Sequence, residues 1–447
     1  MTQTIAPFDL PTFYRACNPS KTIDISNADD RPYYIDFSPV RGSDIIEELQ
    51  ANISLFSPDV PTCQLFAGHI GCGKSTELLR LKAALENDGF HVVYFESSRD
   101  LDMADVDVGD ILLAIAHQVS ENLDAIGLEL QPTGLKAILQ GATAWLRSEV
   151  DVEVAANIPG VGEVGVSKDG FSLGLGIGKL TAKTKNSPKL RSKLRQYLEP
   201  RVTGILSAIN DELLAPAIAA LQQRGKKGLV VIIDNLDRLD SVAKPWGRLQ
   251  PEYLFVDRGE QLRNLNCHVV YTIPLGLVFS NDLGRLVMRF GVDPKVLPMI
   301  PVSRRDGTTD EEGMKLLRQM VLVRAFPGGD SMDSLDAVFD SIESLDRLCC
   351  VSGGHPRNLL KLLHRWIEKE RKLPLSRHSL EAVIKERRNQ LTLPIDDREW
   401  KLLRKVAANK RVNGQEDYQT LVRSTFVFEY RDEEGSWFDI NPILGNG

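Results

Sequence analysis

The sequence predicts an α/β protein built on a mainly parallel β-sheet with helices on both faces. Five short apolar segments are separated by stretches with helical periodicity, an alternation typical of parallel strands joined by helices. A glycine-rich loop follows the first apolar segment, and a carboxylate follows the third. The expected strands are Thr62–Ala67, His91–Glu96, Gly228–Ile233, Cys267–Ile273 and Val296–Ile300.

The glycine-rich loop has the pattern G-x-x-x-x-G-K-[ST], between a predicted strand and a helical pattern over 77–85. Its glycines let backbone N–H groups turn inward around phosphates, and its lysine can reach the β- and γ-phosphates. The serine hydroxyl can bind Mg²⁺, and the helix start adds partial positive charge. We therefore expect ATP and Mg²⁺ as cofactors; a chance match is the alternative. The expected nucleotide-binding residues are Gly68, His69, Gly71, Cys72, Gly73, Lys74, Ser75 and Thr76.

Two carboxylates supply the expected second half of this site. Asp234 follows the buried run 228–233, and Asp237 stands three residues later. Asp234, together with Ser75, is the expected Mg²⁺ ligand, whereas Asp237 could orient or deprotonate the attacking water. An aspartate reaches one methylene less far than the commoner glutamate. The strength of hydrolysis is therefore open, and a nucleotide-locked scaffold with negligible turnover is an alternative.

Three further polar residues could act on the γ-phosphate. Thr272 ends the fourth predicted strand, where its hydroxyl could sense that phosphate. Arg285 and Arg289 precede the fifth strand, and either could stabilise the γ-phosphate of a neighbouring subunit. A surface salt bridge is the alternative for both arginines. The catalytic candidates are thus Lys74, Asp237, Arg285 and Arg289.

A tight turn at Gly353-Gly354-His355-Pro356-Arg357 opens an amphipathic helix. Glycines before a helix and proline at its first position are ordinary helix punctuation, which is the purely structural explanation. Together with the phosphate loop, the Asp234-x-x-Asp237 pair and Thr272, however, this turn resembles the AAA+/STAND branch of P-loop ATPases.

The resemblance covers residues 60–447. It implies a helical lid whose G-x-P turn contacts the nucleotide, so that Pro356 and Arg357 report which nucleotide is bound. It also implies a winged-helix domain after the lid. The arginine that commonly follows the family's sensor-1 strand is absent, because Ile273 and Pro274 stand there.

The expected domain order follows from these motifs. An N-terminal module over 1–60 contains a strand at Tyr33–Phe37 and a helix at Ser43–Asn52. The ATPase core spans 61–302 with an insertion at 120–226, the lid spans 303–392, and the winged helix spans 393–447.

The insertion has two chemically different halves. Apolar and polar residues alternate over about 149–180 around a Lys168-Asp169-Gly170 turn, which predicts a β-ribbon; a membrane-inserting loop is the alternative. The second half predicts a helix over 187–201, with Ser187 as N-cap and prolines at 200 and 216 that should end or kink it. Between positions 179 and 201 the one acidic residue is Glu199, and the basic residues are Lys179, Lys183, Lys185, Lys189, Arg191, Lys193, Arg195 and Arg201.

This basic segment, 179–201, is open to three interpretations: a solvated helix face, a contact for nucleic acid, or a contact for an acidic neighbouring subunit. The predicted winged helix has helices at Asp397–Ala408 and Glu416–Val422 and strands at Thr425–Tyr430 and Ser436–Ile440. From Asp396 onward it carries eight Lys and Arg against ten Asp and Glu. That balance favours protein docking over DNA reading.

Bulk composition limits the remaining possibilities. The chain has 447 residues, a net charge of −7, and six cysteines without paired or zinc-ligand spacing. No signal-peptide pattern and no run of about 20 apolar residues is evident, so we expect a cytoplasmic protein without a membrane contact.

The residues and the resemblance together predict a Mg-ATP-dependent, homo-oligomerising switch. We expect it to control a separate effector or sensor protein, with prokaryotic antiviral defence or signalling as the expected setting. The alternative is an ATP-dependent AAA+ loader or regulator that binds nucleic acid through 179–201. No guanine-reading N-K-x-D motif is visible, and the choice between ATP and GTP stays open.

Overall fold

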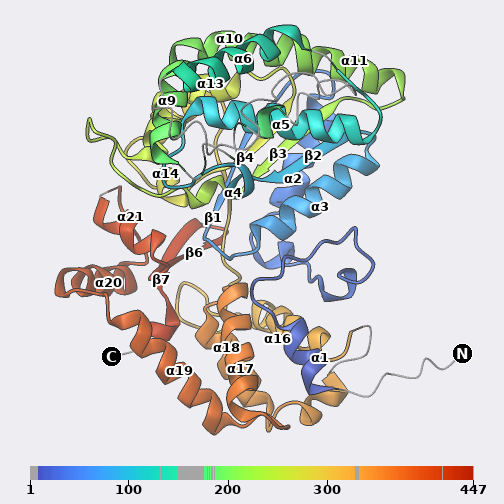
Figure 1. The fold of residues 1–447 in the computed structure, drawn as a ribbon. Coiled ribbons are helices and arrows are strands. Elements are labelled where there is room, and N and C mark those ends of the chain that lie inside the picture. Colours follow the sequence, from blue (N-terminus) through green and yellow to red (C-terminus); the bar gives the residue numbers. More distant parts are fainter. Residues whose placement is uncertain are drawn as a thin grey trace, which may run out of the picture.

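A five-stranded parallel sheet forms the centre of the fold in the computed structural model (Figure 1). The strand order is β2-β3-β4-β1-β5. The structure describes residues 9–130, 132–148, 187–327, 332–414 and 416–445, with positions 176–178, 180, 182 and 185. The strands are β1 (Cys63–Gly68), β2 (His91–Glu96), β3 (Leu229–Asp234), β4 (His268–Thr272) and β5 (Lys295–Leu297). All five expected strands are confirmed, with small shifts at their ends.

Both faces of the sheet are covered, which explains why its strands are apolar throughout. Along β3, Val230 and Ile232 join one buried cluster, whereas Val231 and Ile233 join the cluster on the opposite face. Successive side chains of a strand point to opposite faces, so each face needs its own apolar set. The first face is covered by α2 (Ile45–Ala51) and α3 (Lys74–Asn87), and the second mainly by α5 (Val108–Ala125) and α13 (Gly259–Arg263).

The N-terminal module differs from its prediction. It comprises α1 (Leu10–Ala16), two 3₁₀ turns (Arg31–Tyr33 and Ser38–Val40), and α2, which continues into a π-helical turn (Asn52–Phe56). The strand expected at Tyr33–Phe37 is wrong. Ile35 and Phe37 are buried on either side of exposed Asp36, which produces a strand-like pattern, but they pack into the lid core and pair with no strand.

The described residues of the insertion are mainly helical. Ser187 caps α9 (Pro188–Leu198) by accepting a hydrogen bond from the Leu190 N–H, as expected. A 3₁₀ turn, a π-helical turn and two further helices continue the chain, so the prolines at 200 and 216 change the local helix type without ending the helix. The β-ribbon of 149–180 lies largely outside the described residues, but 176–178 are helical, so the expected ribbon does not reach Ile177. The insertion helices are α6 (Thr133–Ser148), η4 (Glu199–Arg201), α10 (Val202–Ala208), η5 (Ile209–Leu214) and α11 (Ala215–Gln223).

The helical stretch Pro188–Gln223 is long and apolar enough to cross a membrane by length and composition, with a mean hydropathy of 1.4 in its most apolar window. However, Val202, Ile205, Ile209 and Leu213 of this stretch are buried in the main core. This burial is what a core helix of a globular domain requires.

The chain after β5 is mainly helical and includes a two-stranded antiparallel hairpin. The lid contains α16 (Glu311–Ala325), α17 (Ile342–Ser352), α18 (Pro356–Glu370) and α19 (Arg377–Thr392). Helices α20 (Asp397–Asn409) and α21 (Glu416–Arg423) precede the antiparallel hairpin of β6 (Val427–Asp432) and β7 (Gly435–Ile440), which completes a winged helix (Figure 1). The remaining elements are α4 (Ser97–Asp100), η6 (Leu236–Arg238), α12 (Gln250–Glu252), η7 (Tyr253–Asp257), α14 (Leu275–Val278), α15 (Leu283–Phe290), η8 (Met332–Ala337) and η9 (Pro442–Leu444).

Candidate nucleotide-binding site

The phosphate loop connects the end of β1 at Gly68 to the start of α3 at Lys74. Gly71 and Gly73 have φ of +93° and +109°, a region that L side chains rarely adopt. A Cβ added at Gly71 would also lie 2.7 Å from Cε1 of His355 in the lid. Glycine is therefore required at 71 by both backbone conformation and space.

The Lys74 ammonium is buried and fully hydrogen-bonded. It donates to the carbonyl oxygens of Gly68 (2.8 Å) and His69 (2.9 Å), and it pairs with Oδ2 of Asp237 at 2.9 Å. Burial works against the charged form, but the Asp237 carboxylate outweighs it, and the pKa of Lys74 is raised. The structure thus joins two of the predicted catalytic residues and keeps Lys74 positively charged.

Asp234 lies beside this pair and is almost completely buried. Its carboxylate accepts hydrogen bonds from the Tyr94 hydroxyl (2.8 Å) and the Asn235 N–H (2.7 Å), and it is bonded to the Ser75 hydroxyl. Burial and the nearby Asp237 carboxylate raise the pKa of Asp234. Oδ1 of Asp237 is buried without a hydrogen-bond partner. The site therefore holds two close carboxylates and one unsatisfied acceptor.

This oxygen-rich arrangement fits Mg²⁺. A divalent cation would relieve the repulsion between Asp234 and Asp237, and hydroxyl and carboxylate oxygens are its preferred ligands. Ser75 and Asp234 would hold the ion, which when bound would neutralise charge on the phosphate oxygens. The described residues contain no group of three or more His, Cys, Asp or Glu placed to bind a metal.

A cavity extends from the phosphate loop to the N-terminal module. The expected residues Gly71, Cys72, Gly73, Lys74, Ser75, Thr76, Asp234, Asp237, Pro356 and Arg357 line it. The wall beyond them was missed by sequence reasoning. It is formed by Tyr33, Tyr34, Ile35, Phe37 and Arg41 of the N-terminal module, Arg238 of η6, and Met320, Arg324 and Leu360 of the lid.

Arg41 braces the phosphate loop from the N-terminal module. Its Nη2 donates to the Cys72 carbonyl at 2.7 Å, and its guanidinium lies 5.6 Å from the centre of the Phe37 ring. The carboxylate of Glu77 is 4.0 Å away. The N-terminal module is thus part of the site, and no local sequence pattern marks Arg41 for this role.

The lid contacts the phosphate loop through the predicted turn. Nδ1 of His355 accepts from the Asn358 N–H, so its Nε2 carries the proton and donates to the Ile70 carbonyl at 3.0 Å. Burial lowers the pKa of His355 to about 3, which keeps this ring neutral. Pro356 starts α18, and the Arg357 N–H donates to the Gly71 carbonyl at 3.3 Å.

Among the arginines that line the cavity, Arg238 and Arg357 lie close together and have no carboxylate partner in the described residues. Burial and the nearby Arg238 guanidinium lower the pKa of Arg357, because two like charges stand close together. Neither Arg357 nor Arg238 forms an ion pair within the part of the chain that the structure describes. Two adjacent cations of this kind favour an anionic ligand such as a phosphate chain.

The side chain of His69 points away from the cavity and toward the C-terminal hairpin. Its Nε2 accepts the Glu429 N–H at 3.0 Å, and its ring packs edge-on against Phe428. Only its backbone carbonyl faces Lys74. This side chain therefore joins the phosphate loop to the winged helix, and the expected nucleotide contact of His69 stays a prediction.

Thr272 stands behind the site. Its hydroxyl accepts from the Leu236 N–H (2.9 Å) and donates to the Ile233 carbonyl (3.2 Å), and the side chain is fully buried. These bonds hold the turn that carries Asp237. Thr272 does not line the cavity, and its role as a γ-phosphate sensor stays a prediction.

The two candidate trans-acting arginines lie on α15, outside the cavity. Arg285 pairs with Asp257 (3.0 Å) and Asp282 (3.1 Å), and Arg289 pairs with Glu260 (3.4 Å). Both side chains are about half exposed, so the salt-bridge alternative describes them within one chain. Their action on a neighbouring subunit stays a prediction.

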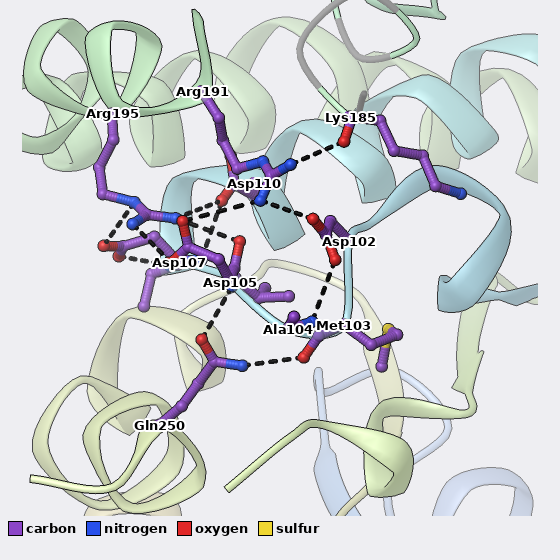
Figure 2. Close-up of polar contacts among 12 residues, drawn as sticks. Asp102, Met103, Ala104, Asp105, Asp107, Asp110, Lys185, Arg191, Arg195 and Gln250 are labelled. Carbon is purple, nitrogen blue, oxygen red and sulfur yellow. Dashed lines mark hydrogen bonds and ion pairs between the residues drawn. The ribbon is translucent and has the colours of Figure 1, made fainter. Parts of the chain in front are cut away.

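The basic segment is largely committed to internal contacts. Arg191 pairs with Asp102 at 2.6 Å, and Arg195 pairs with Asp105 at 2.8 Å in an acidic loop before α5 (Figure 2). Lys185 donates to the carbonyls of Ser98 and Arg99. The solvated-face interpretation is therefore wrong for these three side chains, and less of the charge is free for a polyanion. Lys179 and Lys183 lie outside the described residues.

Comparisons with known proteins found no matching family model and no matching curated protein. Among solved structures, the chain is similar to the ORC2 protein of Aeropyrum pernix (13% identity, 93% of this chain and 94% of that chain, TM-score 0.39). It is also similar to a Walker-type ATPase of Pyrococcus abyssi (10% identity, 96% and 98%, TM-score 0.44) and to Cdc6p of Pyrobaculum aerophilum (12% identity, 93% and 94%, TM-score 0.38). At these values no function follows from the similarities.

Proposed function

We propose that the chain is a Mg-ATP-binding and hydrolysing regulator of the AAA+ kind. The observation that carries this proposal is the convergence of Lys74, Ser75, Asp234 and Asp237 on one cavity that Arg357 also lines. Glycine amides and a protonated lysine suit phosphates, and paired carboxylates with a hydroxyl suit Mg²⁺. Asp237, with one free carboxylate oxygen, is the group placed to orient water.

Phosphate release from ATP tests the hydrolytic part. We expect Asp237→Asn to lower the turnover rate at least about 100-fold, because it removes the general base while nearly preserving side-chain size. Lys82→Ala is the control, because Lys82 lies on α3 outside the cavity and forms an ion pair with Glu86 (3.8 Å). Equal turnover by wild type and Asp237→Asn would contradict this role; absence of turnover in a wild type that binds ATP would favour the nucleotide-locked scaffold.

The contacts around the phosphate loop support a switch. His355 joins the loop to the lid, and His69 joins it to the winged helix, so a change in loop conformation would alter both contacts. We infer that nucleotide controls the arrangement of these domains and thereby self-association and the binding of a separate effector or sensor protein. Light scattering with ATP, with ADP and without nucleotide tests this; identical masses in all three states would contradict it. A setting in antiviral defence stays a prediction.

A nucleic-acid-binding loader or regulator is the second candidate. The winged-helix arrangement of α20, α21, β6 and β7 favours it, whereas the internal ion pairs of Arg191 and Arg195 weaken it. Lys189 remains exposed on α9. Salt-dependent DNA or RNA binding that is reduced by Lys189→Gln would support this candidate, and nucleotide-dependent assembly without nucleic-acid binding would support the switch.

A further inference from the structure

Arg324 is a buried cation without an anion. It lies near the end of α16 and is 5% exposed. Its Nη1 donates to the Met320 carbonyl, but its Nε is buried without any hydrogen-bond partner. Among the described residues no carboxylate forms an ion pair with it. A buried guanidinium of this kind is costly unless another acceptor approaches it.

The surroundings of Arg324 are apolar and aromatic. It lines the same cavity as the phosphate loop, together with Tyr33 of the N-terminal module and Met320 and Leu360 of the lid. The charged or titratable groups that influence it are Cys17 and Tyr33. Arg357, by contrast, is influenced by Asp237 and Cys72. The helix of Arg324, α16, packs against η1 of the N-terminal module, so Arg324 lines the part of the cavity that this module forms, whereas Lys74 lines the part at the phosphate loop.

When the phosphates of a nucleotide lie at Lys74, its ribose and base extend toward the part of the cavity that Arg324 lines. A purine base has flat apolar faces that match the aromatic and aliphatic walls. In adenine the ring nitrogens N1, N3 and N7 are all acceptors, and they match a planar guanidinium that can only donate. Both features of the wall thus have a counterpart in the base.

We propose that Arg324 is a specificity-determining residue that donates a hydrogen bond to a ring nitrogen of the purine base, an inference that rests on the proposed function. The bond would be charge-assisted and shielded from water, which makes it stronger than a bond between neutral groups. Loss of one such bond weakens binding by about 10-fold or more. Arg324 would then recognise the base while Lys74 and Arg357 hold the phosphates.

Calorimetric titration of the full chain with ATP and with 1-deaza-, 3-deaza- and 7-deaza-ATP tests this proposal. Each analogue replaces one ring nitrogen by C–H. Wild type should bind one analogue at least about 10-fold more weakly than ATP. Arg324→Met should bind ATP as weakly as that analogue and should no longer distinguish the two, whereas Lys315→Met, on the exposed face of the same helix, should behave like wild type.

The outcomes separate the two proposals. Failure of wild type to bind ATP would refute the proposed function. Normal ATP binding with equal affinity for all three deaza analogues would refute only the assignment of Arg324. 2′-Deoxy-ATP is titrated in parallel, and discrimination confined to this analogue would also overturn the assignment, because the contact would then be to the ribose. The titrations of wild type with the analogues test the assignment even when Arg324→Met fails to fold.

Discussion

Replacing Glu429 with glutamine is expected to stabilise the protein above neutral pH. Glu429 is 1% exposed in β6; its Oε1 accepts from the Ser436 hydroxyl at 2.7 Å, and its Oε2 has no partner. Burial raises the pKa of Glu429 to about 7. The folded chain therefore holds a proton that the unfolded chain releases near pH 4.5, so stability falls as pH rises from about 4.5 to 7.

The magnitude follows from the same values. A rise from 4.5 to about 7 corresponds to about 3 kcal/mol, at about 1.4 kcal/mol per pKa unit. Glutamine has no charge to bury, and its backbone N–H can still donate to His69. Glu429→Gln should therefore change the free energy of unfolding little at pH 4.5 and raise it by up to about 3 kcal/mol at pH 8.

Denaturant unfolding at pH 4.5 and pH 8 measures this difference. Glu433→Gln is the matched control, because Glu433 lies at the exposed tip of the same hairpin. The reasoning is supported when Glu429→Gln raises the free energy of unfolding more at pH 8 than at pH 4.5 and Glu433→Gln leaves it unchanged at both pH values. A Glu429→Gln variant no more stable than wild type at pH 8 would refute it.

Three further predictions concern the phosphate loop, its contact with the winged helix, and the ion pair between Arg195 and Asp105. Gly71→Ala should weaken ATP binding at least about 10-fold, because φ at Gly71 is +93° and the added Cβ would lie 2.7 Å from His355. The control is Gly127→Ala, which is also at positive φ but has open space around it. Unchanged ATP affinity of Gly71→Ala would contradict the prediction. His69→Ala should cost about 1–3 kcal/mol by leaving the Glu429 N–H unpaired, as measured by denaturant unfolding, and a loss below that range would argue against the contact. Burial works against the charged form of Asp105, but the Arg195 hydrogen bond outweighs burial and lowers the pKa of Asp105, so Arg195→Met should raise this pKa. A titration followed by carbon NMR should then have a higher midpoint pH. An unchanged midpoint would count against the ion pair.

Local motifs explain how much of the site could be predicted. The phosphate loop, Asp234 and the His355-Pro356-Arg357 turn each combine a distinctive residue pattern with a strand or helix boundary, and all of them lie at one cavity. Arg41 and Arg324 could not be found in this way. Arg41 acts through the Cys72 carbonyl, 31 positions away, and a single buried arginine such as Arg324 has no signature in sequence.

The incorrect predictions have a common physical cause. Alternation at Ile35 and Phe37 reflects burial against the lid, and the sequence cannot show whether a partner strand exists. The charge of Arg191 and Arg195 is neutralised by aspartates about 90 residues earlier, which a count over 179–201 does not include. A related case is the contact between His69 and Glu429, which local sequence could not reveal because the two residues lie 360 positions apart.

Calorimetric titration of wild type and Lys74→Ala with ATP and saturating Mg²⁺ tests the central claim most directly. Lys74 is the charged donor at the centre of the site, so the wild type should bind ATP and the variant should bind about 10–100-fold more weakly. Lys82→Ala should match wild type. Absence of ATP binding by the folded wild type, or equal binding by Lys74→Ala, would contradict the account.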